Sequence, residues 1–252
     1  MNTKTHPVSE LSLSQEWDAL SRAMYGGKFI NELAMLFKVN NVKTILECGC
    51  GGGHILAGLA ENSFDVVGID SDKEMISLAR KNYPKLKFEL MSWLDLNLLS
   101  AEFDAVMCRG NSLTHVDSWS SRKLAATHNR IVKLSLIKTS LKIMWDKVKN
   151  GGLLYIDTIS QNEIDSNDGK IEFSQDGISL SGRTTHDWEK RIRIIKGSGI
   201  VNGKIFSGGT VSYLIKPSEI KSLVAELRPK PSRIWEPNLK NEVNYCVVCA
   251  IR

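Results

Sequence analysis

The sequence lacks any apolar stretch that approaches the length of a membrane span. Residues Met1 to Ser14 are polar and lack the hydrophobic segment of a secretory signal. We therefore expect a cytoplasmic protein with no membrane partner. Its five cysteines are an odd number, which is consistent with reduced thiols. At 252 residues we expect one domain, with room for an inserted subdomain.

A recognisable cluster of metal ligands is also lacking, and we expect no metal site. Cys246 and Cys249 form a single C-x-x-C pair that no second pair accompanies. They lie in the apolar run Tyr245–Ile251, where strand alternation would direct the two side chains to opposite faces. We therefore predict that these cysteines pack in the core.

The charge is modest at +5, but Lys and Arg gather between residues 121 and 150, where Asp146 is the only acidic residue. This segment could bind nucleic acid. However, its apolar residues recur at helical spacing, so the lysines are more simply the solvated face of an amphipathic helix. Aromatic residues that could stack on bases do not alternate with the basic ones. Nucleic acid is therefore the less favoured partner, and a homo-oligomer is left open.

The most informative segment is Ile45-Leu46-Glu47-Cys48-Gly49-Cys50-Gly51-Gly52-Gly53-His54, which joins an apolar strand to a helix. Glycine can take positive φ and lets a ligand lie against bare backbone, and a helix start offers unpaired N–H groups. The dinucleotide pattern G-x-G-x-x-G fails because residue 54 is histidine, and no Gly-Lys-Ser/Thr follows as in a P-loop. The segment predicts a different ligand-binding turn.

A second apolar run, residues 64–69, ends at Asp70, whose carboxylate could accept hydrogen bonds from ribose hydroxyls. Ser71 and Asp72 then cap a helix, with Met75 on its apolar face. Together, the glycine turn and Asp70 predict a nucleoside site.

Alternating strands and helices predict an α/β fold with a doubly wound, mostly parallel sheet. We expect its strands at residues 44–47, 65–70, 87–91, 104–108 and 153–157, a last strand at 245–251, and helices at 15–24, 29–37, 55–59 and 131–149. From Lys170 the pattern changes to antiparallel strands, expected at 178–185, 188–195 and 210–215. The glycines suggest turns at 197–199, 202–203 and 208–209, and Ser218 caps a further helix.

Three segments carry a resemblance to a known family. Glu47-x-Gly49-x-Gly51-x-Gly53 resembles motif I of the class I methyltransferases that use S-adenosylmethionine. Ser92-Trp93 stands where glycine N-methyltransferase and related small-molecule N-methyltransferases have Asn-Trp against the adenine. The run from Cys108 to His115 resembles their C-x-G-N-S-x-x-H segment. The resemblance covers about residues 18–157 and the last strand.

The resemblance implies a Rossmann-like core that binds S-adenosylmethionine and releases S-adenosylhomocysteine. The expected cofactor contacts are Tyr25, Lys28, Glu47, Gly49, Gly51, Gly53, Asp70, Ser71, Met75, Ser92, Trp93 and Arg109. The expected organisation is an N-terminal tail at 1–14, lid helices at 15–43, a cofactor-binding core at 44–160 plus 216–252, and an antiparallel β insertion at 161–215 that covers the acceptor.

At the reaction centre the resemblance places Asn111 and His115. Asn111 would orient the acceptor, and His115 is either a general base or a structural histidine bonded to a loop carbonyl. The insertion offers Arg183, His186 and Trp188 as acceptor contacts beside Asn111, although surface or sheet packing is the alternative for each of the three.

We therefore expect a methyltransferase that acts on a small molecule, preferably at nitrogen, by in-line displacement. An O- or C-methyltransferase, an RNA-binding methyltransferase and a non-catalytic cofactor-binding module are the alternatives. One departure concerns the acceptor: Ile159 stands where glycine N-methyltransferase has an arginine for the substrate carboxylate. An acceptor larger or less charged than glycine is expected, unless Arg109 or Arg183 replaces that arginine.

Overall fold

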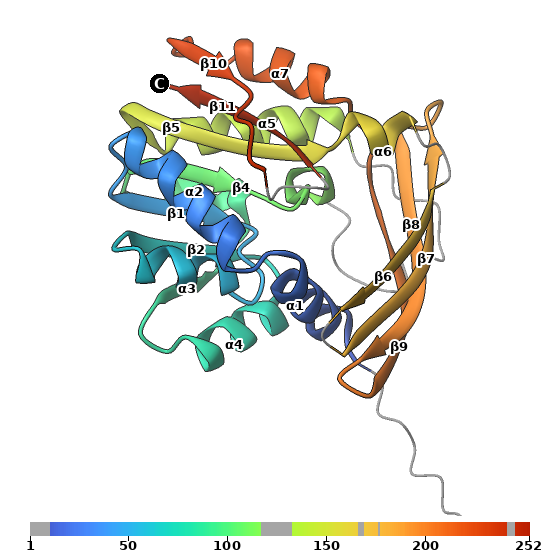
Figure 1. Ribbon diagram of the computed structural model, residues 1–252. Helices are drawn as coiled ribbons and strands as arrows, with labels where there is room; N and C mark the ends of the chain where they lie inside the picture. Colours follow the sequence, from blue (N-terminus) through green and yellow to red (C-terminus); the bar gives the residue numbers. More distant parts are fainter. Residues whose placement is uncertain (1–10, 117–132, 166–168, 176, 241–244) are drawn as a thin grey trace, which may run out of the picture.

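The computed structural model describes residues 11–116, 133–165, 169–175, 177–240 and 245–252. It contains a seven-stranded sheet in the order β10-β11-β5-β4-β1-β2-β3 and a four-stranded sheet in the order β6-β7-β8-β9. Figure 1 shows the four-stranded sheet standing at one end of the larger sheet. The predicted combination of a mostly parallel α/β sheet and a separate antiparallel sheet is confirmed.

The core sheet is parallel except at one edge. Its parallel strands are β1 (Thr44–Cys48), β2 (Asp65–Asp70), β3 (Lys87–Leu90), β4 (Phe103–Cys108) and β5 (Val148–Ile159). The antiparallel edge consists of β10 (Arg233–Trp235) and β11 (Tyr245–Ile251). The central strands are buried over almost their whole length, as expected when helices cover both faces. β10 was not predicted, because three residues are too few for a strand pattern.

Helices cover both faces of this sheet. On one face lie α2 (Gly27–Val39), α3 (His54–Glu61) and α4 (Lys73–Asn82), and on the other α5 (Leu134–Asp146), α7 (Pro217–Ala225), η1 (Trp93–Leu98) and η2 (Ser112–His115). Leu33 and Phe37 of α2 are fully buried against the sheet, so α2 belongs to the core layer. The N-cap of α7 is Lys216 rather than Ser218, because Pro217 occupies the first helical position.

The second sheet consists of long antiparallel strands. These are β6 (Lys170–Gln175), β7 (Ile178–Asp187), β8 (Ile192–Val201) and β9 (Lys204–Tyr213), and the short α6 (Gln161–Asp165) connects β5 to them. Only the turn predicted at Asn202-Gly203 is observed among the three glycine turns. Trp188 lies in the turn before β8 rather than in a strand.

The other glycines lie inside strands, which corrects the predicted turns. Gly182, Gly197 and Gly208 stand opposite one another in register across β7, β8 and β9. Backbone also approaches closely here, since a Cβ on Gly199 would lie 2.0 Å from the carbonyl oxygen of Ser179. Glycine therefore lets neighbouring strands approach closely here and does not end them.

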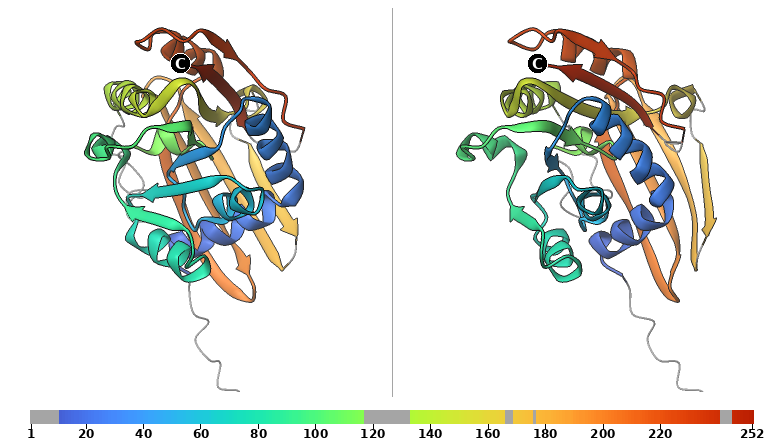
Figure 2. Two further views of the ribbon diagram at one scale, coloured as in Figure 1. Left: turned by 90° about the vertical axis from the view of Figure 1, so that its left-hand side faces the viewer. Right: turned by 60° about the vertical axis from the view of Figure 1, so that its left-hand side comes forward.

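α1 (Leu13–Met24) lies between the core and the second sheet (Figures 1 and 2). A capping box between Ser12 and Gln15 begins this helix. Ser12 donates a hydrogen bond to Glu74 of α4 at 2.6 Å, and Leu20 packs against the second sheet. α1 thus connects the two sheets on one side of the space between them.

Candidate functional site

A cavity lies at the carboxyl ends of β1, β2 and β4, where ligands bind in open α/β sheets. The wall combines loops of the core with α1, β8 and β11. Its residues include Trp17, Asp18, Ser21, Met24, Tyr25, Glu47, Gly49, Gly51, Asp70, Ser71, Met75, Ser92, Trp93, Arg109, Asn111, His115, Arg193, Ile195 and Tyr245.

The glycines of the turn after β1 have different reasons for lacking a side chain. Gly49, Gly51 and Gly53 all have positive φ, of 78°, 53° and 79°. The nearest atom to a Cβ on Gly51 would be Met75 Sδ at 3.8 Å, so bare backbone faces the cavity there. A Cβ on Gly53 would lie 2.6 Å from the Phe88 ring, so Gly53 allows packing and is not on the wall.

Asp70 ends β2 and holds the glycine turn in place. Its carboxylate accepts hydrogen bonds from the backbone N–H groups of Gly51 and Asp72, both at 2.9 Å. Burial raises the pKa of Asp70 to about 6, and these hydrogen bonds oppose the rise. Asp72 caps α4 through the N–H groups of Glu74 and Met75. Asp70 thus faces a cavity that it also helps to shape.

Arg109 and Glu47 form a second charged group, in which Arg109 packs against the Tyr25 ring. The Arg109 guanidinium is 4.1 Å from the centroid of the Tyr25 ring and 5.1 Å from that of Phe29. Burial raises the pKa of Glu47 to about 8, although Arg109 opposes this shift. Glu47 Oε2 is buried and has no hydrogen-bond partner within the described part of the chain. A ligand with a cationic donor would therefore find an unused acceptor here.

Asp157 organises the loop after β4. Its two oxygens accept hydrogen bonds from the backbone N–H groups of Gly110 at 2.9 Å and Asn111 at 2.6 Å. Asn111 takes a left-handed conformation with φ of 58°, and its amide oxygen accepts from the Thr158 hydroxyl at 3.2 Å. The amide orientation is thus fixed from the end of β5.

His115 is neutral at ordinary pH. Burial, and then the nearby charge of Arg193, lower the pKa of His115 to about 3, while a hydrogen bond to the backbone carbonyl of Val211 acts in the opposite direction. The low pKa and the hydrogen bond to Val211 favour a structural role for His115 over that of a general base, because so weak a base removes a proton poorly at neutral pH.

Ser92 and Trp93 line the cavity between β3 and η1. Ser92 Oγ accepts from the N–H of Leu94 at 3.2 Å and so begins η1. Trp93 Nε1 is buried and, among the described residues, has no hydrogen-bond partner. The ring therefore offers an unused donor beside the glycine turn.

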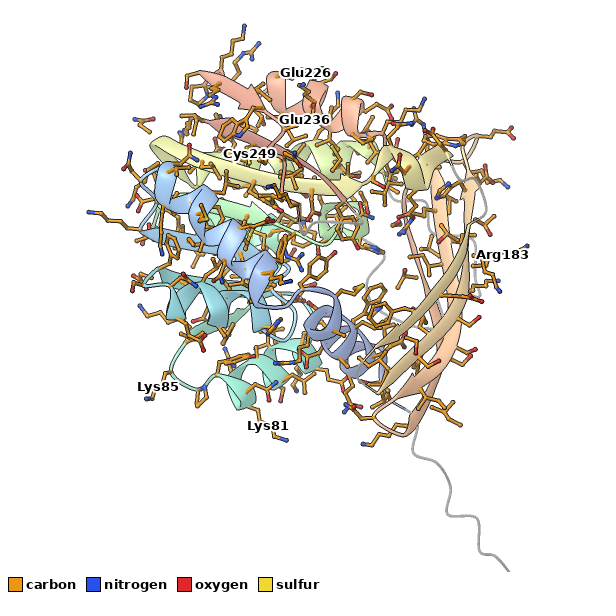
Figure 3. The ribbon with its side chains drawn as sticks, in the orientation of Figure 1. Lys81, Lys85, Arg183, Glu226, Glu236 and Cys249 are labelled. Carbon is orange, nitrogen blue, oxygen red and sulfur yellow. The ribbon has the colours of Figure 1, made fainter. Side chains whose placement is uncertain are left out.

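Besides Gly53, four expected contacts lie outside the wall. Lys28 and Arg183 are exposed, and Figure 3 shows Arg183 pointing away from the molecule on the far side of the second sheet. The His186 side chain is buried with Nε2 4.0 Å from Glu163 Oε1. Trp188 lies in the β7–β8 turn, where Arg191 and Lys216 pack over its ring.

The wall residues that the sequence did not reveal come mainly from α1, β8 and β11: Trp17, Asp18, Ser21, Met24, Arg193, Ile195 and Tyr245. Arg193 and Ile195 alternate along β8 and therefore share one face of the sheet. The alternation is visible in the sequence, but the face that it turns to the cavity depends on how the two sheets pack.

The basic segment is described only in part, since residues 117–132 lie outside the described ranges. In α5, Ile137, Leu141 and Trp145 are buried, while Lys138 and Lys142 are exposed and pair with carboxylates. This part is the predicted amphipathic helix. Over the described ranges, no cluster of three or more potential metal ligands occurs, and no helix is long and apolar enough to cross a membrane.

Comparison with known proteins agrees with this fold. Residues 45–134 match the model of a family described as a methyltransferase domain. The chain is 30% identical over 149 residues to the glycine/sarcosine N-methyltransferase of Parasynechococcus marenigrum, covering 55% of the chain and 52% of that protein. It is 29% identical over 174 residues to the ubiquinone biosynthesis O-methyltransferase of Aliivibrio fischeri, covering 65% of the chain and 66% of that protein.

A solved structure extends this comparison to almost the whole chain. The S-adenosylmethionine-bound amino pentose methyltransferase of Micromonospora echinaspora matches with a TM-score of 0.68 and 16% identity, over 98% of the chain and 99% of that structure. The likeness establishes the class I methyltransferase fold. The chain spans about half the length of the glycine/sarcosine N-methyltransferase that it matches.

Proposed function

We propose that this chain, whose residues 45–134 form a methyltransferase domain on a class I methyltransferase fold, transfers a methyl group from S-adenosylmethionine to a nitrogen atom of a small molecule. The observation that carries the proposal is that one cavity unites the glycine turn, Asp70, Trp93 and the Asn111–His115 loop. The similarity to a glycine/sarcosine N-methyltransferase supports nitrogen as the acceptor atom.

The residues present fit the cofactor. Gly51 leaves bare backbone for the ligand to lie against. Asp70 lies at the end of β2, where a carboxylate accepts from ribose hydroxyls. Trp93 offers an apolar ring with one unused donor for the base. Glu47 has an unused buried oxygen for the ammonium group. Tyr25 provides a ring face of the kind that attracts soft cations.

When bound, S-adenosylmethionine would supply a methyl group activated on a sulfonium, for displacement by the acceptor lone pair with S-adenosylhomocysteine as the leaving group. The chain then supplies alignment and exclusion of water. Thr158 fixes the Asn111 amide, which orients the acceptor, and α1 covers the cavity on one side. Because His115 is too weak a base to accept a proton at neutral pH, the acceptor nitrogen must bind unprotonated, and the proton that it loses after methyl transfer passes to solvent. In this proposal residues 161–215 cover the acceptor.

Calorimetric titration with S-adenosylmethionine and S-adenosylhomocysteine tests the cofactor, with NADH as the control. Micromolar binding of the first two without NADH binding is the expected outcome. Well-folded protein that binds neither would refute the proposal.

An oxygen acceptor is the second candidate, because the ubiquinone biosynthesis O-methyltransferase matches a longer part of the chain. Incubation with S-adenosylmethionine and a mixed panel of primary amines and phenols, analysed by mass spectrometry, separates the two. Methylated amines support the nitrogen acceptor. Methylated phenols alone would replace it with oxygen.

A further inference from the structure

We propose that Arg193 forms an acceptor subsite for a carboxylate carried by the methyl acceptor, and that Glu163 positions its guanidinium. This inference rests on the proposed function, because it concerns the same cavity. It names the substrate class: a small nitrogen compound with a carboxylate and an apolar part.

Arg193 brings a cation to the end of the cavity formed by the second sheet. Its side chain is only 6% exposed, yet it lies on the cavity wall in β8. Its charge lowers the pKa of His115 and opposes the burial that raises the pKa of Tyr245, so the three groups lie close enough to interact. Tyr245 and His115 are wall residues too, and both are neutral at ordinary pH. Among the described residues that line this end of the cavity, Arg193 is therefore the charged one.

Glu163 occupies only one edge of the guanidinium. Arg193 Nε donates to Glu163 Oε1 at 2.7 Å, and Nη2 donates to the same oxygen. A guanidinium has five N–H donors. Glu163 therefore does not contact the edge formed by Nη1 and the second Nη2 hydrogen. Nη1 makes no hydrogen bond to any described residue. Such an edge matches the two oxygens of a carboxylate.

Two polar side chains beside Arg193 also lack hydrogen-bond partners among the described residues. Ser212 of β9 stands opposite Arg193 in register and therefore on the same face of the sheet. The next pair on that face is Ile195 with Thr210. The hydroxyl oxygens of Ser212 and Thr210 are buried, and neither has a hydrogen-bond partner among the described residues. A buried hydroxyl without a partner is costly, and both hydroxyls belong to residues on the face of the sheet that Arg193 and Ile195 share.

We infer that the acceptor has an apolar part because apolar side chains line the cavity beside Arg193. Ile195 lies two residues along the same face, and Val116 lines the cavity from the end of η2. The expected position for an acceptor-binding arginine is filled instead by Ile159, which is 1% exposed and packs with Ile164 and Leu214. The carboxylate therefore meets an arginine from a different element of the fold.

The experiment compares wild type with Arg193→Gln, Glu163→Gln and Arg183→Gln. Arg183 is a matched control, because it lies in the neighbouring strand but is exposed on the opposite face. Calorimetry with S-adenosylhomocysteine comes first. If wild type does not bind it, the proposed function fails; if all variants bind it alike, the folds and cofactor sites are intact.

With S-adenosylhomocysteine saturating, the second titration uses amines matched except for the carboxylate: glycine with glycinamide, β-alanine with β-alaninamide, and 4-aminobenzoate with 4-aminobenzamide. We expect at least one carboxylate to bind about 10-fold or more tightly than its amide, in line with charge-assisted hydrogen bonds. Arg193→Gln should remove that preference and leave amide binding unchanged. Arg183→Gln should behave as wild type.

Glu163→Gln should weaken carboxylate binding by about 3- to 10-fold, because the guanidinium loses its charged anchor but keeps its own charge. With S-adenosylmethionine and the preferred amine, the loss should appear in KM rather than in kcat. The inference is overturned if no carboxylate binds more tightly than its amide, or if Arg193→Gln weakens both members of a pair equally, while S-adenosylhomocysteine still binds.

Discussion

The two sheets contribute to the cavity in different ways. The core sheet acts through the loops that follow its strands: Gly51, Asp70 and Asn111 all lie within a few residues of a strand end. The second sheet acts through side chains in the interior of a strand, Arg193 and Ile195. The core half therefore depends on backbone conformation, whereas the half formed by the second sheet, which we propose binds the acceptor, can change with single side chains while its strands stay in place.

Glycine illustrates the same difference. Gly51 takes positive φ and exposes backbone to the cavity. Gly182 and Gly197 in the second sheet lie in extended strands, where a Cβ on Gly182 would be 2.6 Å from the Lys196 carbonyl oxygen. In one region glycine makes room for a ligand, and in the other it makes room for the neighbouring strand.

The largest expected effect comes from Gly51→Ala. Its Cβ would enter the space in front of the bare backbone, so S-adenosylhomocysteine affinity should fall on the order of 100-fold. The left-handed conformation costs only about 1–2 kcal/mol of stability. Gly203→Ala is the control, because Gly203 has a φ of 77° and no atom within 4 Å of an added Cβ. Calorimetry should show wild-type affinity for Gly203→Ala; an equal loss in both would assign the effect to strain.

Asp70→Asn should weaken S-adenosylhomocysteine binding by about 10- to 100-fold, because a charged acceptor for the ribose is lost. The matched control is Asp104→Asn. Asp104 bonds the Thr44 N–H at 2.8 Å and Lys149 at 2.8 Å at the amino end of the core strands. That change should lower the melting temperature without changing affinity. Unchanged affinity in Asp70→Asn would remove Asp70 from the cofactor site.

Thr158→Val tests the acceptor half from the core side. Without the hydroxyl, the Asn111 amide is free to rotate, and kcat/KM for the methylated amine should fall by about 2- to 10-fold, the range of a neutral hydrogen bond. S-adenosylhomocysteine affinity should remain that of wild type. If the loss appeared in cofactor affinity instead, Asn111 would belong to the cofactor half.

The smallest effect concerns Glu47 and pH. Its folded pKa of about 8 lies above that of a free glutamate, so the folded protein holds this proton more tightly than the unfolded chain. The resulting stabilisation is complete below about pH 4 and is lost as the pH rises toward 8. Glu47→Gln removes this dependence and should raise the melting temperature at pH 8 by several degrees.

Scanning calorimetry of the free protein at pH 5 and pH 8 checks this difference. The melting temperatures of wild type and Glu47→Gln should be similar at pH 5. A variant that is less stable than wild type at pH 8 would mean that Glu47 is ionised in the fold.

The sequence predicted β1, β2, β4 and the second half of β5 because each contains a short apolar run next to turn residues, whereas β3 alternates charged and apolar residues. It also predicted that the glycine turn and Asp70 share a nucleoside site, since the carboxyl ends of parallel strands meet at one edge of a sheet, and the family resemblance added the Asn111 loop; all three line one cavity. It did not predict that Arg183 and Trp188 lie outside the cavity and that Arg193 lies on its wall.

The sequence by itself determined the core half of the cavity, because the groups there are placed by turns a few residues long. Only the tertiary structure decided the acceptor half. Strand register fixes which residues face each other, as Arg193 and Ser212 do, and the packing of one sheet against another fixes which face is inside. Both depend on contacts between residues far apart in the chain, and a one-residue change of register reverses every side chain.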